Sequence, residues 1–362
     1  MRQSAEQVTL SIENAFRKQV QTDSKLRSAY LLIHSEKLGI HLNIAEGSKN
    51  HGTSAYPQQP NYMASVGKIF TSVLVAILVE QGTLSFDDPI ADYLDTLLLE
   101  KLHIYKDTDY THEINIRHLL NQTSGLFDNF WPLLDKLIAN PAFDISPREA
   151  IIWGKEHLTS HFPPGKGFKY TDTNYHLLGL IIESVTNSPF HVALKQYIFE
   201  PVGMLHSSML HYSDSMAPCP YPMADFYFRG HKLNEYKGYA GLDYAGGGVV
   251  APNEDLLKFM KSLVNHTLLT RATIEQMMSD RAKYGIGIDY GYGVMQFITV
   301  PLLMPKVFNA WGHAGATGAF MFYHPQTEAY LIGTFNDASY ERKGVRFMMK
   351  TIHKLSKCVV AE

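Results

Sequence analysis

The chain has 362 residues, of which 45% are hydrophobic and 19% charged, enough for one large domain or two closely packed ones. Its formal net charge is only -3, so the composition gives no indication of a nucleic acid or an anionic membrane as a partner. Cys219 and Cys358 are too few and too far apart for a disulfide framework or a zinc site.

The beginning of the chain lacks the positive region and apolar run of a signal peptide. The longest apolar run, residues 69–79, is too short to cross a bilayer, so we expect no membrane span. The compartment is then cytoplasmic, or periplasmic or secreted if a signal has been removed. The sequence carries no signal for an oligomeric state or a cofactor.

The first elements are predicted from apolar spacing. Residues 6–20 have the period of an amphipathic helix, and residues 28–33 and 39–44 have the pattern of two strands in a hairpin. A long apolar run then begins near Ser65 and stops before Gly82, which predicts a largely buried helix that ends on a glycine cap.

Ser65 and Lys68 lie in the first turn of that helix. A spacing of three residues places two side chains on one helix face, in contact distance. A serine attacks a carbonyl only when a neighbour takes its proton, and a lysine does so only in its neutral form. The free N–H groups of a helix start also suit an oxyanion. We therefore interpret Ser65 as a nucleophile.

An alternative interpretation of Ser65 remains open at this point. About one or two Ser-x-x-Lys matches arise by chance in such a chain, so the motif alone is weak. In that alternative Ser65 only caps the helix and Lys68 reaches solvent.

The rest of the chain changes its period from helix to strand. A helix is predicted over residues 114–120, and mostly helical segments follow to about residue 278. Residues 292–300, 320–324 and 329–335 have strand patterns, and residues 340–357 predict a closing helix. Strands near both ends predict an α+β protein with one sheet built from the two termini and a helical region inserted between them.

Tyr170 and Asp172 stand just before a helix predicted over residues 174–185. In the simplest interpretation, Asp172 or Thr173 caps that helix and the Tyr170 hydroxyl faces water. In the functional interpretation, the phenol relays a proton near Ser65 and Lys68.

Two glycine-rich segments are further candidates. Residues 311–318 join two strand-like stretches, and a free N–H there can serve as an oxyanion donor, with His313 as the polar group. Residues 242–250 are interpreted as a tight turn before a helix that begins at Asn253.

Other catalytic classes find little support. His157 and His161 have a zinc-compatible spacing on a predicted helix, but no glutamate lies between them and two prolines follow. No Gly-x-Ser-x-Gly elbow and no phosphate-binding glycine loop of the Walker type is present. We expect no metal site.

Three motifs in order resemble those of the serine β-lactamase and penicillin-binding superfamily: Ser65-Val66-Gly67-Lys68, Tyr170-Thr171-Asp172 and His313-Ala314-Gly315. The linking segments are similar to the branch that contains class C β-lactamases, D-Ala-D-Ala carboxypeptidases and related esterases. The resemblance covers residues 61–335. It implies an antiparallel sheet flanked by helices, an inserted all-helical domain and a site in the cleft between them. The implied domains are a discontinuous sheet domain formed by residues 1–88 and 280–362 and a mainly helical domain formed by residues 89–279.

The resemblance also implies roles for the site residues. Ser65 would be acylated, Lys68 would activate it, and Tyr170 would be the general base or acid. The backbone N–H groups of Ser65 and Ala316 would form the oxyanion hole. His313 would orient Tyr170 or a substrate carboxylate. The expected lining of the substrate site is Asp172 and Gly315, with cleft walls that include Asp128, Asn129, Trp131 and Tyr244.

Two departures from the family pattern bear on the substrate. Asp172 replaces the usual Asn, and a carboxylate cannot donate to a substrate carbonyl and repels a substrate carboxylate. It can also pair with Lys68, which stabilises the ammonium form and would work against Lys68 as a base. His313 and Ala314 replace Lys and Thr, so a permanent cation and a hydroxyl are lost.

The sequence therefore favours a serine hydrolase of esters or D-amino-acid-containing peptides and amides over an efficient β-lactamase. Its substrate would be a small molecule or peptide-like. The alternative is a catalytically weak homologue that binds peptidoglycan-like or peptide ligands.

Overall fold

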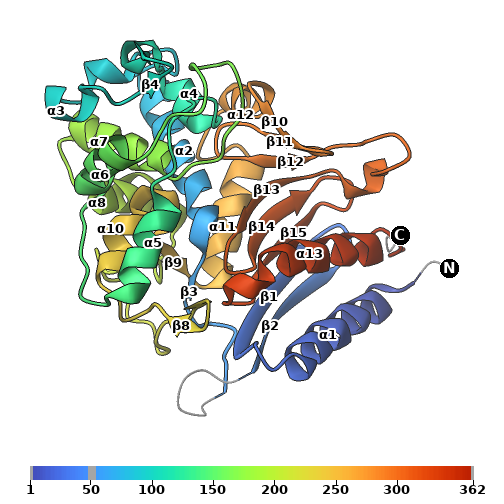
Figure 1. The fold of residues 1–362 in the computed structure, drawn as a ribbon. Helices are drawn as coiled ribbons and strands as arrows, with labels where there is room; N and C mark the ends of the chain where they lie inside the picture. Colours follow the sequence, from blue (N-terminus) through green and yellow to red (C-terminus); the bar gives the residue numbers. More distant parts are fainter. Residues whose placement is uncertain (1–2, 48–53, 360–362) are drawn as a thin grey trace.

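A computed structural model describes residues 3–47 and 54–359 of the chain. Eight strands of this described part form one antiparallel sheet, and β1 joins strands from the end of the chain to the N-terminal hairpin (Figure 1). In spatial order they are β10 (Ala282–Gly285), β11 (Ile288–Tyr290), β12 (Met295–Phe297), β13 (Ala310–Gly315), β14 (Ala319–His324), β15 (Ala329–Thr334), β1 (Ser28–Ser35) and β2 (Ile40–Gly47).

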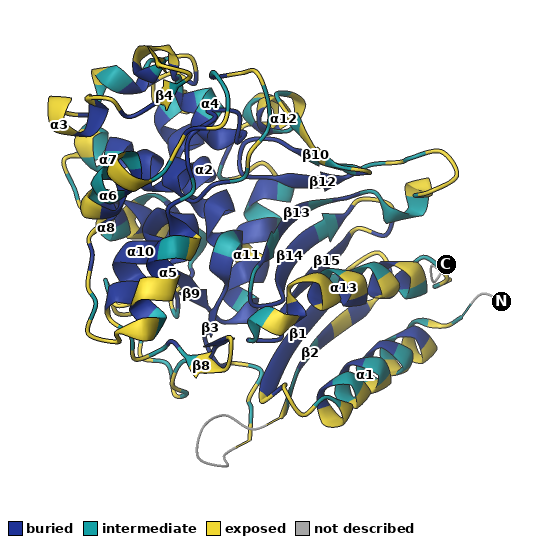
Figure 2. Ribbon diagram, in the orientation of Figure 1, coloured by how far each residue is buried: buried dark blue, intermediate teal, exposed yellow. Residues whose placement is uncertain are grey.

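One face of the sheet is covered by the two terminal helices, α1 (Ala5–Thr22) and α13 (Glu341–Leu355). Their apolar sides pack against the inward side chains of the strands and against each other, as Phe16 of α1 does against Phe347 of α13 at 5.9 Å between ring centroids. The helix predicted over residues 6–20 is α1, and Ser4 caps it with a reciprocal Gln7 contact. Figure 2 shows that both helices expose only their outer sides.

The other face of the sheet packs on α2 (Gly67–Glu80) and α11 (Asn253–Val264). Neighbouring residues of β1 therefore enter different cores: Leu31 faces α1 and α13, while Leu32 faces α2. Both faces are covered, which explains why β1 reads as a continuous apolar run.

The segment between α2 and β10 is mainly helical. Its further helices are α3 (Thr96–Leu99), α4 (Ile116–Leu120), α5 (Phe130–Ala139), α6 (Pro147–His157), α7 (Thr173–Thr186), α8 (Phe190–Leu194), α9 (Glu200–Val202), α10 (Gly238–Gly247) and α12 (Arg271–Ser279). Short strands accompany them: β3 (Asn61–Tyr62), β4 (Ile104–Tyr105), β5 (Thr108–Asp109), β6 (Ser208–Met209), β7 (Tyr227–Phe228), β8 (His231–Lys232) and β9 (Val249–Ala251). The division at residues 88 and 280 stays a prediction.

Three local predictions were wrong. The segment expected to join two strands contains a strand itself, β13. The glycine cluster at 242–250 is not one tight turn, because it forms the end of α10, bent at Tyr244, and then β9. His157 ends α6 and stacks on Trp153, so His161 does not share its helix.

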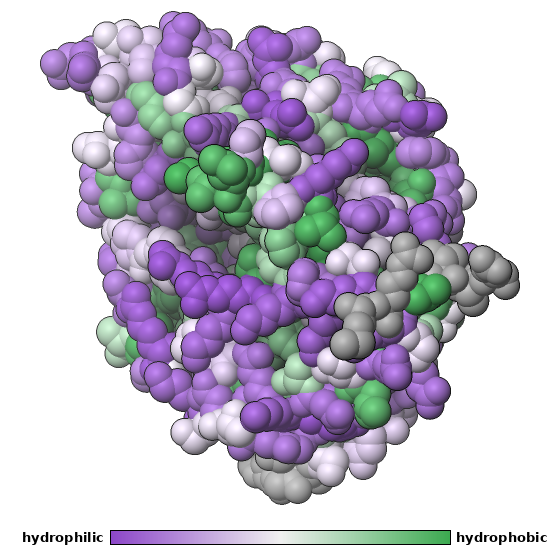
Figure 3. Space-filling model, turned by 90° about the vertical axis from the view of Figure 1, so that its right-hand side faces the viewer, coloured by the Kyte–Doolittle hydropathy of each residue, from purple (hydrophilic) through white to green (hydrophobic). Residues whose placement is uncertain are grey.

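The surface drawn in Figure 3 is mostly hydrophilic, with small separate apolar patches. Within the described residues, no single helix has the length and apolarity needed to cross a membrane. The bent pair of α7 and the segment Phe190–Val202 meets that test by length and composition.

Candidate active site

Ser65 lies in a short 3₁₀ turn, Ala64–Val66, that leads into α2. Ala64 has φ 48°, a left-handed conformation that is strained for a residue with a side chain. Ser65 lines a cleft of about 680 Å³ between the helical segment and the sheet. The helix start predicted near Ser65 and the glycine end at Gly82, with φ +70°, agree with the structure.

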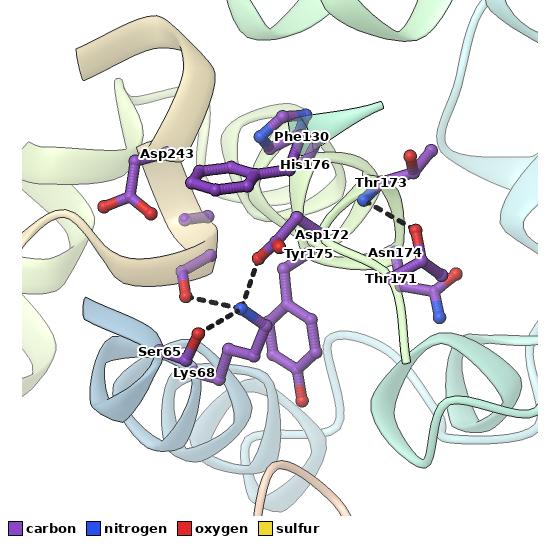
Figure 4. Close-up of polar contacts among 12 residues, drawn as sticks. Ser65, Lys68, Phe130, Thr171, Asp172, Thr173, Asn174, Tyr175, His176 and Asp243 are labelled. Atoms are coloured by element: carbon purple, nitrogen blue, oxygen red, sulfur yellow. Dashed lines mark hydrogen bonds and ion pairs between the residues drawn. The ribbon is translucent and has the colours of Figure 1, made fainter. Parts of the chain in front are cut away.

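Lys68 is fully buried and points back to Ser65 (Figure 4). Its Nζ donates to Ser65 Oγ at 3.3 Å and to the Gly246 carbonyl at 2.8 Å, and it forms an ion pair with Asp172 Oδ1. Three acceptors match the three donors of an ammonium group. The alternative in which Lys68 reaches solvent and Ser65 only caps the helix is wrong, since Lys68 is buried and no capping bond forms.

The glycines of α10 explain how this contact arises. A Cβ at Gly246 would lie 2.8 Å from Asp172 Oδ1 and 3.5 Å from Lys68 Nζ. A Cβ at Gly67 would lie 2.8 Å from the Cα of Gly247. Only residues without side chains let the end of α10 approach the start of α2 so closely. The Gly246 carbonyl can then accept from Lys68.

Tyr170 packs its ring near the same lysine. Lys68 Nζ lies 5.0 Å from the ring centroid, and the rings of Tyr290 and His313 lie 5.8 and 6.3 Å away. The Tyr170 hydroxyl is buried and accepts or donates no hydrogen bond of good geometry among the described residues. Burial and the charge of Asp172 raise the pKa of Tyr170 well above its usual range, and the neighbouring Ser65 hydroxyl opposes that rise. Tyr170 is therefore protonated at rest.

We expect Tyr170→Phe to separate activity from stability. Loss of a proton relay lowers kcat by about 10² to 10⁴. The free energy of unfolding should change by less than about 1 kcal/mol, because the missing hydroxyl had no partner. Ester turnover and urea denaturation of the same preparation measure both. A large loss of stability, or unchanged turnover, would contradict the role of Tyr170.

His313 lies beside Tyr170, and both of its ring nitrogens have partners in the protein. It is fully buried in β13, where Nε2 lies 3.0 Å from the Tyr290 hydroxyl and Nδ1 lies 2.6 Å from the Ala314 carbonyl. Burial and the charge of Lys68 lower the pKa of His313 to about 3. A neutral ring with both nitrogens engaged is not available to a substrate carboxylate, and it contacts Tyr170 only through its ring. The role of His313 toward Tyr170 or a substrate carboxylate stays a prediction.

The end of β13 lies against the turn that holds Ser65. A Cβ at Gly315 would lie 2.7 Å from the Met63 carbonyl oxygen and 2.9 Å from the Ala64 Cβ, so glycine permits this approach. Gly315 and Ala316 both line the cleft. Among the described residues, the backbone N–H groups of Ser65 and Ala316 donate to no protein acceptor. Two free donors beside a candidate nucleophile suit an oxyanion.

Three aspartates gather around this single buried lysine. Besides Asp172, Asp128 and Asp243 line the cleft. Asp128 was predicted from the sequence, whereas Asp243 was not. Asp128 Oδ1 accepts from the backbone N–H of Asp172 at 3.2 Å, and burial and the Asp172 charge raise the pKa of Asp128 to about 6. Burial and Asp172 likewise raise the pKa of Asp243 to about 7. No local pattern marks Asp243, since its place depends on how α10 packs.

Of the four predicted cleft walls, Asp128 and Trp131 line the cleft, and Asn129 and Tyr244 do not. Trp131, 43% exposed, lines the cleft. Asn129 is instead buried, with its side-chain nitrogen 3.4 Å from His176 Nδ1. Tyr244 points into the helical core, where a Cβ at Gly179 would lie 2.3 Å from its ring. The bend at Tyr244, with φ 38°, turns its side chain away from the cleft.

We expect stability to fall as pH rises from about 4 to about 7. Over that interval the folded state keeps a proton on Asp243 that the unfolded chain releases, because the folded pKa is raised from 3.8 to about 7. The slope is about 1.4 kcal/mol per pH unit for one such group. In the Asp243→Asn variant, the free energy of unfolding should lose the part of its pH dependence that comes from Asp243 and keep the part that comes from Asp128. Parallel pH profiles of the free energy of unfolding for the two proteins would contradict the raised pKa.

Comparisons with known proteins agree on one family. The family model described as "Beta-lactamase" matches residues 17–347. Penicillin-binding protein 4* of Bacillus subtilis (strain 168) is 28% identical over 302 residues, which cover 77% of this chain and 62% of that protein. The chain thus spans less than two thirds of that relative's length.

Solved structures share the fold over nearly the whole chain. The D-amino acid amidase of Ochrobactrum anthropi SV3, complexed with D-phenylalanine, has a TM-score of 0.78 at 19% identity, over 97% of this chain and 99% of that one. EstCE1, a hydrolase with promiscuous acyltransferase activity, has a TM-score of 0.76 at 18% identity, over 97% of this chain and 99% of that one. At these identities the likeness concerns the fold alone.

Proposed function

The chain belongs to the beta-lactamase family, as its three motifs predict. From this premise we propose that it is a serine hydrolase that forms an acyl-enzyme on Ser65. The observation that carries the proposal is the contact of buried Lys68 Nζ with Ser65 Oγ at 3.3 Å, at the wall of a cleft. The free N–H groups of Ser65 and Ala316 support it, because unpaired donors beside a nucleophile can stabilise a developing oxyanion.

The proposed reaction moves one proton through Tyr170. Ser65 Oγ attacks the substrate carbonyl, whose oxygen takes up the negative charge between the two N–H groups. Tyr170 rests in its protonated form, so its hydroxyl accepts the proton of Ser65 as it gives its own proton to the leaving group. The bond between the carbonyl carbon and the leaving group then breaks, and the acyl group stays on Ser65. Lys68 holds Ser65 Oγ and provides positive charge beside the Ser65 hydroxyl and the Tyr170 ring. Water then releases the acyl group by the reverse route.

The proposed substrates are carboxylic esters or D-amino-acid-containing amides and peptides. A β-lactam carboxylate would meet the carboxylate of Asp172 and a neutral His313, which disfavours it. The structurally similar amidase and EstCE1 support amides and esters as the classes to examine.

Intact-protein mass spectrometry tests the proposal. The protein is incubated separately with p-nitrophenyl acetate, D-phenylalanine amide and benzylpenicillin, and release of each product is followed in parallel. We expect a transient acetyl adduct and turnover of the ester or the amide at least about a hundred-fold faster than that of the penicillin. Absence of any adduct and any turnover would overturn the hydrolase assignment, and fastest turnover of penicillin would overturn the substrate class.

A catalytically weak binding protein is the second candidate function, and the buried Lys68–Asp172 ion pair favours it. A lysine held as an ammonium has no lone pair with which to take a proton. If this candidate is correct, we expect Asp172→Asn to raise ester turnover by about ten-fold or more, because the pair is lost. If the hydrolase assignment is correct, the same variant should show equal or lower turnover. The kcat of the two proteins on p-nitrophenyl acetate decides between them.

A further inference from the structure

Asp243 is a buried carboxylate whose two oxygens have different surroundings. Its Oδ2 accepts a hydrogen bond from the Tyr62 hydroxyl at 2.8 Å, and that hydroxyl lies 2.7 Å from the Tyr239 hydroxyl. No described group donates to Oδ1, although the residue is only 4% exposed and lines the cleft. A carboxylate oxygen that has no donor in the protein, on a mostly buried residue that lines a cleft, is suited to a donor that arrives with a ligand.

The open oxygen of Asp243 lies close to the candidate nucleophile. A Cβ built on Gly247 would be 2.6 Å from Asp243 Oδ1 and 2.8 Å from the carbonyl carbon of Ala64. Both atoms are thus within 3 Å of one point, and Ala64 directly precedes Ser65. Figure 4 shows Asp243 on the ribbon of α10, on the side of Lys68 away from Asn174. A ligand group that reaches Oδ1 therefore lies beside the reacting serine.

The charges near Asp243 are unbalanced. Lys68 is the cation that acts on it, and all three donors of Lys68 are taken by Ser65, Asp172 and Gly246. Asp172 acts on Asp243 as a second negative charge. The cations that line the cleft, Lys169, Arg342 and Arg346, are exposed. An additional positive charge at Asp243 would be stabilised by both carboxylates.

Aromatic rings complete the surroundings of Asp243. The cleft is lined by Tyr62, Phe130, Trp131, Phe228 and Tyr239. The ring of Tyr239 contacts three of the others, at centroid distances of 5.7 Å to Tyr62, 6.3 Å to Phe130 and 6.1 Å to Phe228. Aromatic faces attract organic cations, and a carboxylate among them is the usual combination in an ammonium site.

We propose that Asp243 and these aromatic rings form a subsite for an ammonium group on the acyl part of the substrate. This inference rests on the proposed acyl-enzyme at Ser65. The acyl side is assigned because the leaving group takes its proton from Tyr170, whose ring packs against Tyr284 and Tyr290 of β10 and β11. Asp243 belongs to α10, which instead contacts the turn before Ser65.

Two pairs of esters test the subsite. The first pair is the p-nitrophenyl ester of 4-(trimethylammonio)butyrate and its neutral isostere, the ester of 5,5-dimethylhexanoate. We expect kcat/KM to favour the charged ester by at least about ten-fold, and the ratio of the two kcat/KM values to fall to near one in Asp243→Asn. The second pair is acetylcholine, which carries the charge on its leaving group, and its neutral isostere 3,3-dimethylbutyl acetate. This pair should show no preference that depends on Asp243.

A matched control removes the same formal charge elsewhere. Asp135→Asn, at an exposed ion pair with Arg229, should leave the preference unchanged. A wild-type preference near one, or a preference that survives Asp243→Asn, would overturn the subsite. A preference that depends on Asp243 in the choline pair alone would overturn the assignment to the acyl side.

A binding measurement separates this inference from the proposed function. Titration calorimetry with tetramethylammonium chloride compares Ser65→Ala with the Ser65→Ala/Asp243→Asn double variant, and needs no turnover. We expect binding to the first protein that weakens at least ten-fold in the second. Equal binding, or none, would overturn the subsite. If no ester is hydrolysed but this difference appears, the hydrolase proposal fails and the ammonium subsite is supported.

Discussion

The Ser65→Ala variant is expected to lose ester hydrolysis by at least about a thousand-fold, together with every covalent adduct. The hydroxyl of Ser65 accepts a hydrogen bond from Lys68 Nζ, and Ser65 lines the cleft. Among the described residues, no other hydroxyl group forms a hydrogen bond with Lys68. Its loss leaves the free N–H groups and the cleft in place. The remaining rate therefore reports only substrate binding and polarisation of the substrate carbonyl by these N–H groups. Initial rates on p-nitrophenyl acetate and intact mass measure the effect.

Ser72→Ala is the matched control for this variant. Ser72 lies on the same helix, but its hydroxyl is 3.1 Å from the Tyr175 hydroxyl and away from the cleft. Tyr175 keeps a second partner in the Leu120 carbonyl, so the fold should tolerate the change. We expect near wild-type turnover from Ser72→Ala. Undiminished hydrolysis by Ser65→Ala would show that another group is the nucleophile.

The second large effect is expected from Lys68→Met, which should lose both activity and stability. Methionine fills the buried space without a charge, so the carboxylate of Asp172 is left in the interior without its ion-pair partner. Breaking a buried pair in this way costs about 3–5 kcal/mol of unfolding free energy. Turnover should fall by about a thousand-fold or more, because Ser65 loses its activating neighbour. Urea denaturation and ester kinetics measure the two effects.

The double variant Lys68→Met/Asp172→Asn separates the two consequences. Removing both charges should recover most of the lost stability, since no uncompensated carboxylate remains. Activity should stay as low as in Lys68→Met. If the double variant remained as unstable as the single one, the ion pair would not explain the loss. If it regained activity, Lys68 would not be the activating partner.

Local patterns predicted the elements that depend on neighbours in sequence. The spacing of Val8, Ile12, Phe16 and Val20 predicted α1, and all four are buried. The pattern of strands at both ends predicted the α+β fold with one sheet from two termini, which the structure and its neighbours confirm. Such patterns report which side of an element faces a core, and that information is contained in a few turns of chain.

Predictions failed where a residue's surroundings come from distant segments. The glycines at 246–248 read as a turn, because no local signal shows that α10 ends against α2. Tyr244 was assigned to the substrate site, yet the bend in α10 buries it in the helical core. His313 lies beside Tyr170 but is fully buried, with both ring nitrogens engaged within the protein. Asp243 was missed for the same reason.

By itself, the sequence determined the family, the α+β fold and the three motifs that name Ser65, Lys68 and Tyr170 as candidates. Only the tertiary structure decided that Lys68 is saturated by Ser65, Asp172 and Gly246, and that the His313 ring is neutral and closed off. The physical reason is that charge states and free donors depend on burial and on contacts between residues more than a hundred positions apart. The spacing of residues along the chain does not show these contacts.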